Sequence, residues 1–350
     1  MKNTLALVLA LAVVSSPAYA SRARLEALGE GKNGSYYIND ARNMFLNPAS
    51  IVKHKKKLLL ELGSAEPAAV GGVRADLPNN SRAQGGFINT FGDFTYAVYL
   101  NNVSDSSMAL FAGTQRPLSA VEVTLAGEGT IGWGLSLAHG YGPTGANNVS
   151  TLGARFGVNK DDLSVFGTVG LLGKGTDGTT EAKSKLNLDL GATYQLGDFT
   201  AFGNFISASM ENDVAKTSGY AVGVGHKKEM TKSTNMFTRI EARQRKVENA
   251  GPANINAWNL PVVLGAEAQA LSWLALRGSI THSLLGQRDA AATSVAAGVG
   301  MTFGDVTVDG LVATNAGALA GNLGTNGIAS SSTFGFGDDM ISRIAMTYNF

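Results

Sequence analysis

The residues that could carry out chemistry are few in this chain, and their spacing does not assemble them. The sequence has four histidines, His54, His139, His226 and His282, and no cysteine. Without cysteine there is no disulfide framework, no thiolate nucleophile and no zinc–thiolate site. A serine hydrolase needs a serine hydrogen-bonded to a histidine, and His282 cannot serve Ser283 because neighbours on a strand point to opposite faces. We therefore expect no enzyme activity, no metal and no other cofactor.

The densest run of charge lies on one alternating stretch, residues 235–247. Its odd positions carry Arg239, Glu241, Arg243 and Arg245. In a strand these four side chains share one face. A row of arginines in a pore favours anions, so a selective lumen wall is one interpretation. A salt-bridged wall without selectivity is the alternative, since charges pair readily across strands.

The composition indicates the kind of element that positions these residues. The chain of 350 residues contains 44 glycines and only 16% charged residues, against about 7% glycine and about 25% charge in ordinary domains. This mixture is typical of a turn-rich β protein. With 28 basic and 27 acidic residues the chain is nearly neutral, so it offers nucleic acid little attraction and we expect no nucleic-acid partner.

The first twenty residues predict export. Lys2 precedes the ten-residue apolar run 5–14, and the small-residue segment after it ends in Ala18-Tyr19-Ala20. This is the pattern of a secretory signal peptide over residues 1–20, with cleavage expected after Ala20. A spanning helix needs about 20 apolar residues, twice what is present.

Alternation in the mature chain predicts long strands. In residues 183–196 leucines recur at even positions while the odd positions carry Lys183, Lys185 and Asp189. The last twelve residues alternate in the same way and end on Phe350. Strands of soluble sheets usually have five or six residues, whereas a tilted strand that crosses a membrane needs about 9–11. The length favours a membrane-spanning barrel over a soluble secreted β protein, which stays as an alternative.

Sixteen such segments can be placed between residues 56 and 350, with fourteen as the alternative number. They are 56–64, 82–91, 94–102, 118–127, 130–141, 150–159, 162–173, 183–196, 199–211, 217–228, 233–247, 259–271, 273–285, 292–303, 306–316 and 339–350. Tight connections alternate with longer polar ones, as short periplasmic turns alternate with long external loops in outer-membrane barrels. We therefore predict an all-β fold, an antiparallel transmembrane β-barrel over residues 56–350.

Three of the tight connections share a Gly-Asp pair: Gly92-Asp93, Gly197-Asp198 and Gly304-Asp305. Glycine at the first central position supplies the positive φ that a two-residue hairpin matching the strand twist requires. Aromatic residues flank these turns, which would place them at the membrane interface.

If the apolar face of each strand meets lipid, the other face lines the lumen. The ionisable residues on that face are Glu61, Glu122, Arg155, Lys183, Lys185, Asp189, Arg239, Glu241, Arg243, Arg245, Glu267, Arg277, Asp309, Asp339 and Arg343. Each unpaired buried ion costs several kcal/mol, so a dry apolar core could not hold them. The sequence predicts a wet or plugged lumen.

Residues 21–55 precede the first strand and are organised differently. Asn39-Asp40 could begin a helix, and the stretch from Asp40 to Ala49 ends in Asn47-Pro48-Ala49. This stretch resembles the N-terminal segment of the FadL-like outer-membrane transporter superfamily. The resemblance covers about ten residues together with the signal peptide and the terminal Phe350. It implies that the segment plugs the barrel, with Asn47, Pro48 and Ala49 in the plug, and that hydrophobic solutes pass through.

These observations predict a porin-like channel or transporter in the bacterial outer membrane. It would pass small solutes passively, hydrophobic ones among them, with outer-membrane lipid around it. Phe350 would be the signal that the barrel-assembly machinery reads. A structural major outer-membrane protein with a closed lumen is the first alternative. Residues 21–55 would form either the plug or a periplasmic segment. The oligomeric state and the identity of the solute do not follow from the sequence.

Overall fold

The computed structural model describes residues 21–63, 82–102, 119–144, 147–177, 180–211, 215–249, 255–286, 293–313 and 341–350. The predicted signal peptide and Asp339 lie outside the described residues.

The chain begins with three short helices, each set by a polar cap. They are α2 (Arg22–Ala27), η1 (Ala41–Phe45) and η2 (Pro48–Lys53). The side chains of Ser21, Asp40 and Asn47 accept hydrogen bonds from backbone N–H groups of the first turns, which is the usual function of such residues at N-caps. Pro48 follows Asn47 at the first helical position, where its missing N–H costs nothing. The helix start predicted at Asn39-Asp40 is confirmed.

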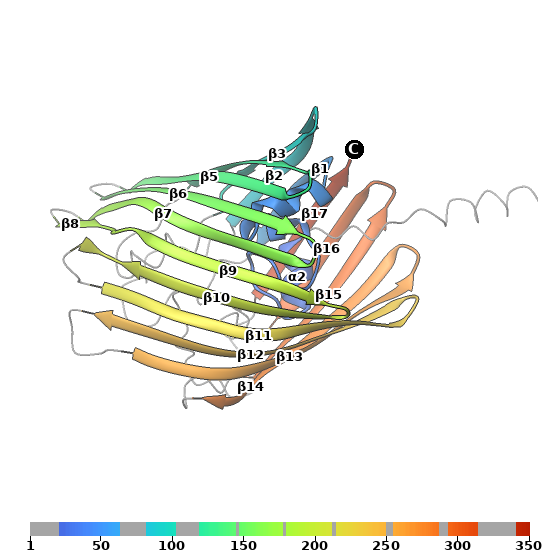
Figure 1. The fold of residues 1–350 in the computed structure, drawn as a ribbon. Helices are drawn as coiled ribbons and strands as arrows, with labels where there is room; N and C mark the ends of the chain where they lie inside the picture. Colours follow the sequence, from blue (N-terminus) through green and yellow to red (C-terminus); the bar gives the residue numbers. More distant parts are fainter. Residues whose placement is uncertain are drawn as a thin grey trace, which may run out of the picture.

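The rest of the described chain is antiparallel sheet. Its strands are β1 (Lys57–Gly63), β2 (Arg82–Phe91), β3 (Phe94–Leu100), β4 (Ser119–Gly127), β5 (Gly132–Thr144), β6 (Asn147–Lys160), β7 (Leu163–Asp177), β8 (Thr180–Lys183), β9 (Asn187–Leu196), β10 (Phe199–Ser209), β11 (Ala215–Thr231), β12 (Thr234–Asn249), β13 (Ile255–Leu271), β14 (Leu274–Gly286), β15 (Thr293–Phe303), β16 (Val306–Ala313) and β17 (Ile341–Asn349). Consecutive strands pair with each other, except that β8 and β9 both pair with β7, and β17 pairs with β1. The sheet is therefore a closed barrel (Figure 1).

The predicted number of strands is confirmed, with one local difference. The segment 183–196 was expected to be one strand, but it is interrupted after Lys183. Both β8 and β9 pair with β7, and Lys174↔Lys183 and Gly170↔Asn187 belong to the same register. At the interruption Ser184 donates its N–H to Gly173 and Lys185 donates to Ser209. We therefore count β8 and β9 as one wall strand, and the ring has sixteen.

The tight hairpins confirm the turn chemistry expected from the Gly-Asp pairs. Gly92, Gly197 and Gly304 have φ of 57°, 63° and 60°. Because consecutive strands are antiparallel neighbours, the three hairpins lie at one end of the barrel. Aromatic side chains surround that end: Phe91 is 79% exposed and Phe303 is 59% exposed.

The two faces of the wall differ as the alternation predicts. The outward side chains are large and apolar, and Leu135, Leu137, Leu264 and Ile344 are among the exposed ones. The inward positions are glycine, alanine, serine and threonine, interrupted by buried charges. No helix among the described residues is long and apolar enough to cross a membrane.

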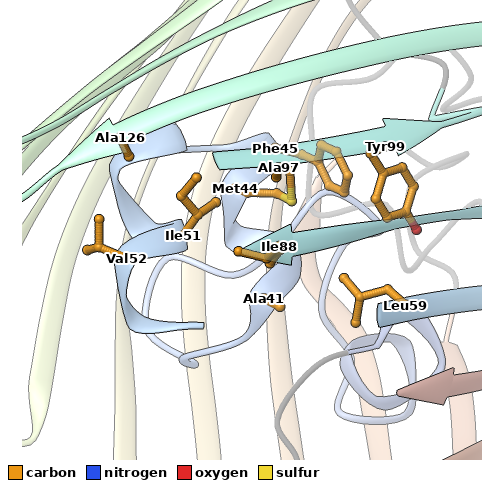
Figure 2. Packing of buried hydrophobic residues seen from close by; sticks show 10 residues of the cluster. All are labelled: Ala41, Met44, Phe45, Ile51, Val52, Leu59, Ile88, Ala97, Tyr99 and Ala126. Atoms are coloured by element: carbon orange, nitrogen blue, oxygen red, sulfur yellow. The ribbon is translucent and has the colours of Figure 1, made fainter. Parts of the chain in front are cut away.

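Residues 21–55, which we call the N-terminal segment, pack against the inward face of the wall. Helix α2 packs against β14–β17, while η2 packs against β3–β6 on another part of the ring. An apolar cluster joins the segment to the inner surface of the first strands, and Figure 2 shows it. Its members are Ala41, Met44, Phe45, Ile51, Val52, Leu59, Ile88, Ala97, Tyr99 and Ala126.

Candidate functional site inside the barrel

The first residues of the N-terminal segment contact carboxylates of the wall. The Ser21 hydroxyl donates to Asp309 Oδ2 at 2.6 Å, and the Arg22 backbone N–H donates to Glu61 Oε1 at 2.9 Å. Asp309 lies on β16 and Glu61 on β1. Helix α2 has no acidic residue in its first turn, so these two wall residues supply the negative charge that a helix N-terminus favours.

Arg24 lies at the centre of the buried ion pairs. It donates through Nε to Glu267 Oε2 at 2.9 Å and through Nη1 to Asp40 Oδ2 at 3.1 Å. Arg277 donates to the same Glu267 at 2.6 Å and to Asp309 at 2.5 Å. The five side chains form one chain of charges that joins α2, the residue before η1, and strands β13, β14 and β16.

A second arginine, Arg42, ties η1 to the first strands. It donates to Glu61 Oε2 at 2.6 Å and to the Tyr99 hydroxyl at 3.2 Å. Its guanidinium also lies over the Phe45 ring, 4.7 Å from the centroid. Arg42 and Arg24 are each 1% exposed, and such burial is tolerable because each is paired with carboxylates.

The wall approaches the Asn47-Pro48-Ala49 stretch very closely. Asn47 donates to Asn159 Oδ1 at 2.7 Å. A methyl group added to Gly157 would overlap the Asn47 amide oxygen, and one added to Gly134 would overlap the backbone of Pro48 and Ala49. The two glycines therefore make room for the stretch.

On the opposite side the segment meets β7, β10 and β12 through aromatic and charged groups. The Tyr36 ring stacks on Phe202 with centroids 4.6 Å apart, and Phe166 lies 6.1 Å away. Arg239 donates to Glu30 Oε2 at 3.3 Å, and Tyr37 donates its hydroxyl to Glu30 Oε1 at 3.0 Å.

Three ionisable groups of the segment, Glu26, Glu30 and His54, illustrate how burial and charge shift the pKa. Burial raises the pKa of Glu26, but attraction to Arg22 and Arg343 outweighs it and holds the pKa below its usual value. For Glu30 burial dominates, so its pKa is raised despite Arg239. Burial, together with Lys57, Lys53 and Arg24, lowers the pKa of His54 to about 3.

Several residues predicted to face the lumen hold the N-terminal segment. Arg343 donates to Glu26 at 2.5 Å, and Arg155 donates to the Phe45 carbonyl at 2.9 Å while pairing with Glu122 at 2.8 Å. Glu267 and Arg239 contact the segment as described above. Arg277 reaches it only through Glu267 and Asp309.

Other residues predicted to face the lumen have contacts within the wall. Arg243 donates to Asn259 at 2.8 Å, and Arg245 is half-buried two residues further along β12. Asp189 accepts a hydrogen bond from Asn204. Lys183 pairs with Glu181 at 2.8 Å, and both side chains, like Lys185, are exposed. Within the Arg239–Arg245 row, Arg239 binds the segment through Glu30, while Arg243 contacts Asn259 of the wall.

Glu241 has an unusual environment within this row. Its side chain is 1% exposed, and its oxygens lie 3.7 Å from Arg239 Nη1 and 3.8 Å from Arg243 Nε. Neither oxygen accepts a hydrogen bond. The carboxylate is balanced by charge, although the distances are too long for hydrogen bonds.

The histidines are spread over the molecule. His139 stacks on Tyr141, His226 stacks on Phe199, and His282 hydrogen-bonds Thr293 at 2.7 Å. His54 is buried and contacts Asn39 Oδ1 at 3.2 Å. Within the described part of the chain, none of these contacts joins a histidine to both a serine and a carboxylate.

The sequence alone does not identify the residues of the N-terminal segment that bind the charged residues of the wall. Ser21, Arg24, Glu26 and Glu30 lie in a stretch that is largely polar and charged, and Asp40 and Arg42 lie in the stretch that resembles the FadL-like segment. Neither stretch indicates which wall residue each side chain contacts. The excess of charge on inward wall positions was the available signal, because those charges need partners.

Comparison with known proteins gives similarity in structure only. No protein-family model and no curated protein matches the sequence. Among solved structures, the chain is similar to the Ralstonia pickettii toluene transporter TbuX, with 13% identity, a TM-score of 0.45 and coverage of 96% of this chain and 100% of that one. The Pseudomonas putida toluene transporter TodX shares 11% identity, with a TM-score of 0.41 and coverage of 95% and 98%. These values are too low to carry a conclusion about solute or activity.

Proposed function

We propose that this protein is a passive channel or transporter for small solutes in the bacterial outer membrane. The observation that carries the proposal is the inverted distribution of side chains: a closed barrel with large apolar groups outside and buried charges inside. A belt of leucine, valine and isoleucine costs nothing in lipid, whereas a soluble protein rarely exposes so much apolar surface. The aromatic side chains at the hairpin end fit a membrane interface.

We further propose that the N-terminal segment is the plug of this channel. It contacts strands around much of the ring, and many of its contacts with the wall are ion pairs and hydrogen bonds. If the segment leaves the wall, polar contacts of this kind can be replaced by contacts with water. The pairing of the wall strands does not depend on them. The plug is thus a separate layer inside a complete wall.

Removal of residues 21–50 tests both statements. We expect the shortened barrel to fold, because every wall pairing lies outside the deleted residues, and its conductance in a planar bilayer to rise well above that of the full mature chain. Heat-modifiable migration on a gel reports the folded barrel in both samples. A folded barrel with unchanged conductance would contradict the plug, and migration unaffected by heating, with the protein in the periplasmic fraction, would contradict the membrane location.

The inward positions support small polar solutes as substrates in addition to the hydrophobic ones that the resemblance implies. Thr151, Asn187, Thr281, Ser283 and Ser294 are buried inward residues with hydrogen-bonding groups. Swelling of liposomes that contain the shortened barrel, in sugars and in amino acids of increasing size, measures this permeability. If a small aromatic probe permeates and every polar solute is excluded, the proposal that polar solutes are substrates is wrong.

A structural protein with a permanently closed lumen is the second candidate. The full burial of Arg24 and Arg42, two arginines of the segment that pair with wall carboxylates, favours it, because opening would expose several ion pairs at once. If the full chain never conducts under any voltage while the shortened chain does, the closed protein is the better description.

A further inference from the structure

The residue that follows the predicted cleavage point of the signal peptide lies inside the barrel. Ser21, the first residue after Ala20, is 0% exposed and caps α2. Proteases cleave exposed, extended chain, and a bond beside a fully buried residue is beyond their reach. Cleavage must therefore come before the N-terminal segment enters the lumen.

Cleavage also changes the charge of Ser21. The new terminus carries an α-amino group, which is protonated at neutral pH because its ordinary pKa is about 7.7–8.0. At the start of a helix this positive charge is unfavourable unless an anion offsets it. Asp309 is in place: its Oδ2 already accepts the Ser21 hydroxyl at 2.6 Å, while Oδ1 accepts from Arg277 at 2.5 Å.

We propose that the α-ammonium group created at Ser21 by signal-peptide cleavage is a bound ligand of Asp309, and that this pair fastens the N-terminal segment in the lumen. Asp309 is 1% exposed. Its Oδ2 accepts the neutral Ser21 hydroxyl, and an ammonium on the same residue adds a positive charge beside this oxygen. Signal-peptide processing thereby prepares the segment for docking.

The chain contains no cysteine, so a single introduced thiol reports docking. Ala23→Cys places the thiol at a position that is 1% exposed, and it reacts with a maleimide only when the segment leaves the wall. Lys53→Cys lies at an exposed position and controls for reagent and pH. N-terminal sequencing of the mature protein comes first, and a terminus other than Ser21 would overturn the proposal.

The mature chain is then acetylated while unfolded near pH 6.5, where the α-amino group reacts ahead of the lysines because of its lower pKa. After refolding, checked by heat-modifiable migration, we expect the thiol of Ala23→Cys to react about tenfold faster than in the unacetylated chain, since charged hydrogen bonds exceed neutral ones in strength. Lys53→Cys should react equally in both.

Asp309→Asn distinguishes the charge pair from crowding by the acetyl group. If the ammonium binds Asp309, acetylation adds little to the effect of Asp309→Asn, because both changes remove the same interaction. Asp305→Asn, at an exposed turn position next to the same strand, is the matched control and should leave the effect of acetylation intact. Fully additive effects, or no effect of acetylation, would overturn the proposal.

Discussion

The buried arginines show how single residues decide whether the N-terminal segment stays in the lumen. Arg239 and Glu30 are 4% and 1% exposed, so neither can exchange its partner for solvent without movement. Removing one member of a buried pair leaves the other uncompensated, which costs about 3–5 kcal/mol. Removing both can be nearly neutral.

We therefore predict that Arg239→Gln destabilises docking of the segment by a few kcal/mol, on the order expected for a broken buried pair. Adding Glu30→Gln should restore part of the loss. Labelling of the Ala23→Cys thiol measures docking in each variant, with Lys228→Gln, which removes one member of an exposed pair with Asp198, as the control. If the double variant is no better docked than Arg239→Gln, the pair is not what holds this part of the segment.

His54 makes a second prediction at this scale, one of pH dependence. Its pKa falls from 6.5 to about 3 on burial near Lys57, Lys53 and Arg24. The undocked segment therefore binds more protons than the docked one between these two values. Docking is fully favoured above pH 6.5 and weakens as the pH falls, with a limiting slope of about 1.4 kcal/mol per pH unit.

A thiol at Ala41, a fully buried member of the cluster in Figure 2, reports this effect. Because the thiolate is the reacting form, labelling slows in both proteins as the pH falls, but the labelling rate of the parent relative to that of His54→Gln should increase from pH 7 to pH 5. Burial raises the pKa of Glu30 and of Asp40, so these two groups favour docking more strongly as the pH falls, opposite to His54. The parent and His54→Gln are therefore compared at each pH. Equal pH profiles would exclude His54 as the source.

At the scale of elements, the wall could be predicted from the sequence because its signals are local. Period-two alternation sets the strand faces, and a glycine with positive φ marks each Gly-Asp hairpin. These two rules are nearly sufficient to predict a closed antiparallel barrel. The break after Lys183 was missed because the alternation continues through it.

The route of the N-terminal segment could not be predicted because its contacts are distant in sequence. Arg24 and Glu267 are separated by 243 residues, and Ser21 and Asp309 by 288. Nothing local in residues 21–42 indicates which wall carboxylate each arginine will meet. The glycines that receive the segment are equally hidden, because Gly134 resembles the many other glycines of the strands.

Those glycines give a prediction for η2. Gly134→Ala would drive a methyl group into the backbone of Pro48 and Ala49, and overpacking of this kind costs about 1–3 kcal/mol. We expect the wall to fold and the segment to dock less firmly, read as faster labelling at Ala41→Cys. Gly203→Ala is the control, since its methyl group would meet Val222 at an ordinary 3.8 Å. If Gly134→Ala fails to fold while Gly203→Ala folds, Gly134 is needed for strand pairing in the wall and not for docking of the segment.

At the scale of the whole molecule, the barrel depends on the seam where its two ends meet. Strands β1 and β17 pair from Lys57↔Asn349 to Gly63↔Arg343. The Phe350 N–H adds a bond to the Lys56 carbonyl at 3.2 Å. Its ring is 50% exposed and lies 6.2 Å from Tyr348 at the aromatic end. With only seven residues in β1, every interaction at this seam matters for closure.

Deletion of Phe350 should therefore lower the yield of assembled barrel while leaving export unaffected, because the signal peptide acts before the last strand is needed. The heat-modifiable fraction measures assembly, and the amount of chain cleaved after Ala20 measures export. Phe91→Ala removes an even more exposed aromatic, 79% accessible, from the β2–β3 hairpin, which takes no part in the β1–β17 pairing, so it should assemble like the parent. If the two variants lose barrel equally, the aromatic end as a whole matters and Phe350 has no special part in closure; if neither does, seven wall pairs suffice to close the ring without the terminal residue.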